Sequence, residues 1–169
     1  MRILITYYSN TGNTEKIAKS MAEGLAHAEV DIKPVGDTDP NSLRSYDLVL
    51  LGSGIYASKV SKEIVNLVKK TEELPENFVL FCTHASVTNY QNGFRTVKKA
   101  IDKVGSKIIA EWDCRGENLG MSEEQQKSML AALPEAQRKK AEKDQKELKG
   151  HPNAEDLESA KNFALNLIL

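Results

Sequence analysis

The sequence has few of the features that mark a secreted or membrane-embedded protein. Only two cysteines, Cys82 and Cys114, occur in 169 residues, too few for a disulfide framework. No apolar run reaches the roughly 18 residues needed to cross a bilayer. The residues after Met1 lack the apolar core and small-residue cleavage site of a secretion signal. We therefore expect a cytoplasmic protein with no membrane span.

The chain also lacks a surplus of either charge. Lys and Arg number 23, Asp and Glu number 24, and the formal net charge is −1, whereas a nucleic-acid-binding domain normally shows a basic surplus. No group of His, Cys, Asp and Glu has the spacing of a metal site. The composition, 40% hydrophobic and 28% charged, is close to the globular average. We expect one domain over residues 1–169, with no bound nucleic acid and no metal.

Short apolar runs alternate with amphipathic stretches along the chain. The runs are 3–7, 30–34, 48–51, 78–82 and 107–112. The three central runs scarcely alternate with polar residues, which is typical of strands buried on both faces. The stretches between them repeat apolar residues at helical spacing. This order predicts an α/β fold, a doubly wound five-stranded parallel sheet with helices on both faces.

Two local signals predict where helices begin. Asp39 precedes Pro40 in the short link between the second and third strands, which indicates a single helical turn capped by Asp39. Asn153 precedes the last apolar repeat and Asp156 follows three residues later, as expected for a capped helix start.

A charged stretch at about 122–149 does not fit the alternation of strand and helix. It is rich in residues of both charges and in good helix formers, which favours a solvated helical insertion. A partner-docking arm is the alternative interpretation of the same stretch.

The loop after the first strand carries the clearest chemical signal. Its residues are Ser9, Asn10, Thr11, Gly12, Asn13 and Thr14. In an open parallel sheet, ligands bind beyond the carboxyl ends of the strands. A helix that starts there offers free backbone N–H groups and a partial positive charge, which hold a phosphate without Lys or Arg. We expect a phosphate site here; the alternative is an ordinary turn that caps a helix.

Three competing protein classes that share parts of this architecture are excluded. A P-loop requires a Gly-Lys-Ser/Thr ending, and the loop has no lysine. A dinucleotide fold requires three spaced glycines after the first strand, and only one is present. A two-component receiver needs acidic residues at the end of that strand, where Tyr7, Tyr8 and Ser9 stand.

Ser-Asn-Thr-Gly-Asn-Thr at 9–14 resembles the flavodoxin phosphate loop, [ST]-x-T-G-x-T. The resemblance extends to Gly-Ser-Gly-Ile-Tyr at 52–56, Thr-His-Ala-Ser at 83–86 and Gly-His-Pro-Asn at 150–153. It covers everything except roughly 122–149. It implies the strand order 2-1-3-4-5 and FMN as the cofactor, with the phosphate on residues 9–14.

The resemblance also implies positions for the flavin ring, between the loops that follow the third and fourth strands. The candidate residues are Ser53, Gly54, Ile55 and Tyr56 from the first loop, and Thr83, His84, Ala85 and Tyr90 from the second. Gly54 would turn its peptide toward the reduced ring, because glycine accommodates both peptide orientations. Tyr56 and Tyr90 would stack on the ring. His84 would either bind the flavin or be satisfied by nearby backbone.

The chain departs from typical flavodoxins, which are strongly acidic. The three cofactor loops contain no Asp or Glu, but they contain Lys59, and Lys62 and Arg95 follow just beyond. Carboxylates near the ring disfavour the anionic reduced flavin, so their absence predicts a less reducing cofactor.

The leading functional expectation is an FMN-binding electron-transfer protein that meets redox partner proteins transiently, as a monomer or weak dimer. The sequence offers no catalytic residue for turning over a substrate. The alternative is an FMN-dependent oxidoreductase of the quinone reductase or protoporphyrinogen oxidase type, with the 122–150 segment as a lid. A third possibility is an interaction domain without flavin.

Overall fold

A computed structural model describes residues 1–86 and 90–169. The strands are β1 (Arg2–Tyr8), β2 (Glu29–Pro34), β3 (Leu48–Gly54), β4 (Asn77–His84) and β5 (Lys107–Arg115). The α-helices are α1 (Asn13–Gly24), α2 (Lys62–Lys70), α3 (Arg95–Lys103), α4 (Glu123–Ala131), α5 (Glu135–Leu148) and α6 (Ala154–Asn166). Two 3₁₀ turns, η1 (Val35–Asp37) and η2 (Pro40–Ser45), join β2 to β3.

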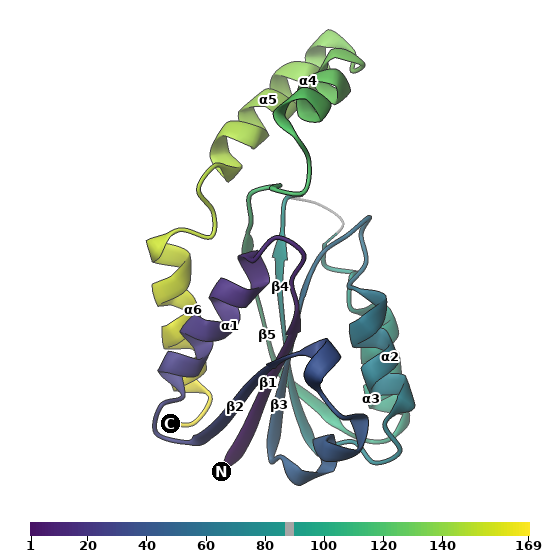
Figure 1. The fold of residues 1–169 in the computed structure, drawn as a ribbon, viewed down its shortest axis with the longest axis vertical. Coiled ribbons are helices and arrows are strands. Elements are labelled where there is room, and N and C mark those ends of the chain that lie inside the picture. Colours follow the sequence, from purple (N-terminus) through teal and green to yellow (C-terminus); the bar gives the residue numbers. More distant parts are fainter. Residues whose placement is uncertain (87–89) are drawn as a thin grey trace.

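The five strands form one parallel sheet in the order β2-β1-β3-β4-β5, which confirms the predicted fold class. Helices α1 and α6 cover one face, and α2 and α3 cover the other (Figure 1). Because β1 pairs with β2 on one side and β3 on the other, the winding direction reverses at β1. This reversal is the place where ligands bind in such sheets.

Three strands extend two or more residues further at their carboxyl ends than the apolar runs indicated. β3 continues to Gly54, β4 to His84 and β5 to Arg115, because backbone pairing does not require apolar side chains. In the register of the sheet, Gly54 of β3 lies opposite Thr83 of β4, and His84 of β4 lies opposite Arg115 of β5. Ser53, Gly54, Thr83 and His84 are therefore strand residues, and their expected placement in loops was wrong.

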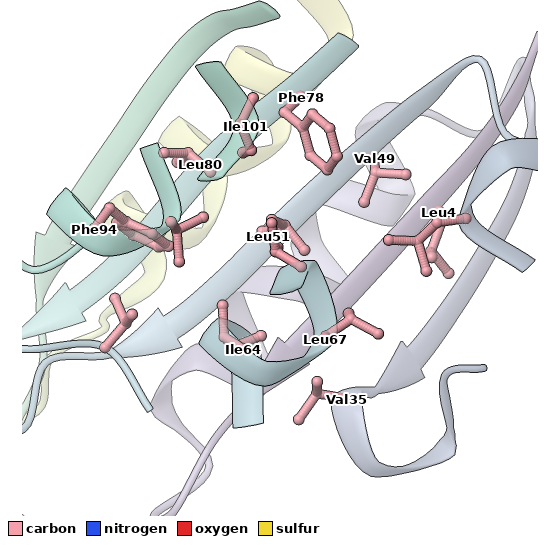
Figure 2. Close-up of a cluster of buried hydrophobic side chains, with 14 of the residues drawn as sticks. Leu4, Val35, Val49, Leu51, Ile64, Leu67, Phe78, Leu80, Phe94 and Ile101 are labelled. Atoms are coloured by element: carbon pink, nitrogen blue, oxygen red, sulfur yellow. The ribbon is translucent and has the colours of Figure 1, made fainter. Parts of the chain in front are cut away.

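Both faces of the sheet carry a hydrophobic core. Leu51 of β3, Phe78 of β4, Ile64 of α2 and Ile101 of α3 are fully buried in the first (Figure 2). The second lies under α1 and α6 and includes Phe81. The apolar residues of the central strands thus point alternately to the two faces, as a doubly covered sheet requires.

The two cysteines lie in different cores. Cys82 belongs to the core under α2 and α3, whereas Cys114 belongs to the core under α1 and α6. Both are unbridged. Burial raises the pKa of the Cys82 thiol to about 12 and also raises the pKa of the Cys114 thiol. Neither thiol forms appreciable thiolate near neutral pH, so both are unreactive as nucleophiles. The sheet also keeps the two thiols in separate cores.

Helices α4 and α5 form a hairpin that projects beyond the carboxyl ends of the strands (Figure 1). Ser122 caps α4 in a capping box with Gln125. The Arg138 guanidinium of α5 donates to the carbonyls of Leu130, Ala131 and Leu133 at 3.1 Å each. These bonds satisfy carbonyls at the end of α4, so the hairpin is held largely by its own contacts.

Both predicted helix starts are confirmed. The Asp39 carboxylate accepts from the Asn41 backbone N–H, with Pro40 as the first residue of η2. Asn153 accepts from two backbone N–H groups of α6, and Asp156 completes a capping box. Among the described residues, no helix is long and apolar enough to cross a membrane.

The packing of α1 against α6 gives a stability prediction. A Cβ at Gly24 would collide with the Lys161 carbonyl, and it would lie 3.1 Å from the Leu165 nitrogen. We expect Gly24→Ala to lower the free energy of unfolding by about 1–3 kcal/mol through overpacking. Urea denaturation would measure the loss. Gly36→Ala, where nothing lies within 4 Å, is the matched control, and an equal change in both variants would contradict the prediction.

Candidate functional site

A pocket of about 300 Å³ lies where the carboxyl ends of β1, β3, β4 and β5 meet. Its lining residues are Ser9, Asn10, Thr11, Asn13, Thr14, Gly54, Ile55, Tyr56, Thr83, His84 and Ala85, together with the segment 116–121. The pocket thus brings together most of the residues expected from sequence. Gly12, Ser53 and Tyr90 lie outside its lining.

The loop at 9–14 lines the pocket with all of its residues except Gly12. Gly12 precedes α1 with a φ of 89°, a left-handed conformation that only glycine adopts without strain. Within the described part of the chain, the backbone N–H groups of Thr11, Gly12, Asn13 and Thr14 donate no hydrogen bond. At a helix N-terminus these free donors carry partial positive charge. The loop therefore has the geometry of an anion site.

The Asn13 side chain adds an unsatisfied acceptor. It is buried, and its Nδ2 donates to the Glu117 carbonyl at 2.8 Å. Its Oδ1 is buried without a partner among the described residues. Such an atom needs a donor from a ligand or a water molecule. A mononucleotide with a phosphate and free sugar hydroxyls matches this set of groups, because its phosphate accepts hydrogen bonds and its hydroxyls donate them.

The Thr14 hydroxyl is engaged within the protein. It lies 2.9 Å from the Thr83 hydroxyl of β4, and both side chains are buried. This bond ties the loop after β1 to the end of β4. Thr14 therefore positions the loop through its side chain, and its backbone N–H remains free for an anion.

Ser53 and Gly54 form the end of β3 beside the pocket. The Ser53 hydroxyl donates to the Gly54 carbonyl at 2.7 Å and accepts from the Ser61 backbone N–H at 3.0 Å. A Cβ at Gly54 would lie 2.6 Å from the Tyr56 hydroxyl. Ser53 thus holds the strand end from outside the pocket, and only glycine leaves room for the tyrosine.

Tyr56 follows β3 and contacts the loop that follows β1. Its hydroxyl accepts from the Asn10 backbone N–H at 3.2 Å. Its ring meets Tyr8 edge-to-face, with centroids 5.7 Å apart. Burial raises the pKa of the Tyr56 hydroxyl, so it remains a neutral phenol that can donate or accept. Its stacking on a flavin remains a prediction.

His84 is buried at the end of β4 with both ring nitrogens engaged. Nδ1 lies 2.6 Å from the Ser86 carbonyl, and Nε2 lies 3.0 Å from an Asp113 carboxylate oxygen. The Tyr90 ring stacks on the His84 ring at 3.6 Å with an interplanar angle of 3°. Tyr90 therefore faces the histidine, and its contact with a flavin remains a prediction. Across the residues described, no group of three or more His, Cys, Asp and Glu could hold a metal.

The segment 116–121 also lines the pocket, and none of its residues was predicted from the sequence. Gly116 N–H donates to the His84 carbonyl at 3.0 Å, and Glu117 N–H donates to the His151 carbonyl at 2.8 Å. A Cβ at Gly116 would lie 2.9 Å from Asn13 Nδ2. The position of this segment after the fifth strand, with Gly116 and Gly120, is the signal that could have identified it.

The Thr14–Thr83 contact allows a double-mutant test. Thr14→Val leaves the buried Thr83 hydroxyl without its partner, so we expect a loss of about 1–3 kcal/mol in the free energy of unfolding. Adding Thr83→Val removes both partners, and the double variant should lose less than the sum of the two single losses. Denaturant titrations of the four proteins measure the coupling; strictly additive losses would refute this role of the bond.

The comparisons with known proteins agree with this architecture. An uncharacterized protein of Methanocaldococcus jannaschii is 28% identical over 170 residues, covering 99% of both chains. The flavodoxin-like domain-containing protein BilS of Clostridioides difficile is 25% identical over 177 residues, covering 100% of this chain and 97% of its own. An NAD(P)H dehydrogenase (quinone) of Paraburkholderia phymatum is 30% identical over 92 residues, or 41% of this chain and 46% of that protein.

Solved structures share the fold. The oxidised flavodoxin 2 of Bacillus cereus has a TM-score of 0.69 at 18% identity, covering 99% of this chain and 98% of its own. A flavoprotein of Lactobacillus acidophilus in complex with FMN has a TM-score of 0.53 at 19% identity, covering 66% of this chain and 92% of its own. The model of the flavodoxin domain family matches residues 4–165. The chain therefore belongs to the flavodoxin domain family.

Proposed function

We propose that this protein binds FMN in the pocket and carries electrons between redox partner proteins of the cytoplasm. The backbone N–H groups of residues 11–14, which donate no hydrogen bond to a described residue, are the observation that supports this most strongly. They suit a phosphate in a pocket whose described lining holds no Lys or Arg. Membership of the flavodoxin domain family supports the same cofactor.

Different residues of the pocket would hold different parts of this cofactor. The N-terminus of α1 would bind the phosphate, and the unpaired Asn13 Oδ1 would accept a hydrogen bond from a ribityl hydroxyl. The ends of β3 and β4 would flank the ring through Gly54, Tyr56 and Ala85. Bound FMN supplies one-electron and two-electron transfer, while the protein positions it and shapes its surroundings.

The size and charge of the pocket favour a carrier. Its volume of about 300 Å³ is at the low end of the range for small-molecule sites, which suits a cofactor without an added substrate. Glu117 is the one charged side chain in the lining drawn from the described residues, and its carboxylate accepts from the Gly150 N–H at 2.9 Å. Such a site offers few charged groups for acid–base chemistry on a second molecule.

A comparison of FMN with riboflavin tests the phosphate site. We expect FMN to bind at least about a hundredfold more tightly, because riboflavin leaves the amides at 11–14 without an anion. Thr11→Ala should weaken FMN by about 1–3 kcal/mol and leave riboflavin unchanged. Flavin fluorescence quenching measures both, with exposed Thr96→Ala as the control. Equal affinities for the two flavins would overturn the placement of the phosphate.

The partial match to an NAD(P)H dehydrogenase (quinone) supports an enzyme as the second candidate. Steady-state assays of the FMN-loaded protein with NADPH or NADH and a benzoquinone separate the two functions. We expect turnover below about 0.1 s⁻¹ for a carrier, whereas enzymes usually reach about 1 s⁻¹ or more. Saturable turnover above about 0.1 s⁻¹ would contradict the carrier and assign the protein as a quinone reductase.

A further inference from the structure

Positive charge is concentrated on the face formed by α2 and α3. The segments 57–70 and 90–104 contain eight Lys and Arg against two Asp and Glu, in a chain whose net charge is −1. The remainder of the chain therefore has an acidic surplus. Helices α2 and α3 lie side by side over one face of the sheet (Figure 1), so the two basic segments form one surface.

The carboxyl-edge end of this surface is hollowed into a groove of about 520 Å³. Four exposed side chains supply its charge, and we call it the cationic groove: Lys59, Lys62, Arg95 and Lys99. None of the four has an ion-pair partner within the described ranges, whereas neighbouring Lys98 binds Glu111 at 2.7 Å. The groove therefore presents charge that the described protein leaves uncompensated.

The groove adjoins the candidate FMN site through a single turn. Tyr56 lines the pocket and Lys59 lines the groove, and two backbone hydrogen bonds of 2.7 and 3.0 Å join these residues. The Val60 N–H donates to the Gly93 carbonyl at 3.3 Å, which connects this turn to the approach to α3. A molecule in the groove would thus lie beside the edge of the site.

The fold itself does not account for these cations. Lys62 and Arg95 are the first residues of α2 and α3. The positive end of a helix dipole favours acidic residues at that position and disfavours basic ones. Two cations that line the same groove are therefore placed where they oppose helix stability.

We propose that the cationic groove docks the acidic surface of a redox partner protein. The proposal rests on the proposed function, because a partner held there would exchange electrons with the cofactor in the adjoining pocket. The four free cations are complementary to carboxylates, and such complementarity raises association rates and selects partners. Acidic partners are expected to react faster than basic ones.

Electron-transfer kinetics test the proposal on the FMN-loaded protein. An acidic [2Fe–2S] ferredoxin, chemically reduced, serves as the probe and gives one electron to the protein. We expect Lys62→Glu with Arg95→Glu to slow this reaction at least tenfold at low ionic strength and to accelerate electron transfer to cytochrome c, a basic protein. At 0.5 M salt the differences should fall below about twofold because the charges are screened.

The control variant carries the same change in net charge on the opposite layer. Lys19→Glu with Lys161→Glu alters an exposed residue of α1 and a half-buried residue of α6 and should change both rates less than twofold. The groove variant, Lys62→Glu with Arg95→Glu, should fold, because acidic residues at the starts of α2 and α3 suit the helix dipole. Lys59→Gln with Lys99→Gln is a second groove variant that removes positive charge without adding negative charge. Equal slowing by groove and control variants would overturn the proposal.

A binding experiment on the flavin-free protein tests this proposal separately from the proposed function, because it does not require bound FMN. Amide NMR shifts on adding an octaglutamate peptide should concentrate at residues 58–66 and 92–99, with at least tenfold weaker binding in the groove variant. Shifts elsewhere would refute the groove even if FMN binds. An eight-nucleotide RNA that binds tenfold more tightly than the peptide would assign the groove to nucleic acid and overturn the proposal.

Discussion

Parallel pairing of β1 with β3 is the constraint on which the site depends. It places Tyr8 opposite Ser53, so that the loop after β1 and the turn after β3 leave the sheet side by side. The register of β3 with β4 then brings Gly54 opposite Thr83. Because every strand runs in the same direction, all these carboxyl ends meet at one edge of the sheet. The pocket is the space that they enclose.

Polar contacts between distant segments then fix the shape of the pocket. Thr14 binds Thr83, Asn13 binds the Glu117 carbonyl, and Gly116 binds the His84 carbonyl. Each contact joins segments at the carboxyl ends of different strands and contributes on the order of 1 kcal/mol. A site that is ordered before its ligand arrives loses less conformational entropy on binding. The free donors of α1 are therefore held ready for an anion.

The sequence predicted the architecture well because it depends on local signals. The five apolar runs located the strands, and Asp39 and Asn153 located two helix starts. Polar strand ends escaped detection, since pairing with a neighbouring strand extends β5 to Arg115. Val104 follows the apolar spacing of α3 yet is 56% exposed, and it lies just beyond Lys103, the last residue of the helix.

The pocket was less predictable from sequence than the sheet. The loop at 9–14 has a contiguous motif, but segment 116–121 joins the pocket through contacts with residues over a hundred positions away. The pairing of His84 with Asp113 likewise arises from the approach of β4 to β5. Sequence spacing carries no information on such contacts without the register of the strands.

The central claim is that backbone amides at the start of α1 hold the terminal anion of a mononucleotide without a cationic side chain. The most direct measurement is the amide NMR spectrum of the flavin-free protein as FMN is added, with riboflavin as the comparison. The account predicts downfield shifts of the amide protons of residues 11–14 that FMN produces and riboflavin does not. Saturation with FMN that leaves those four amide resonances unchanged would contradict it.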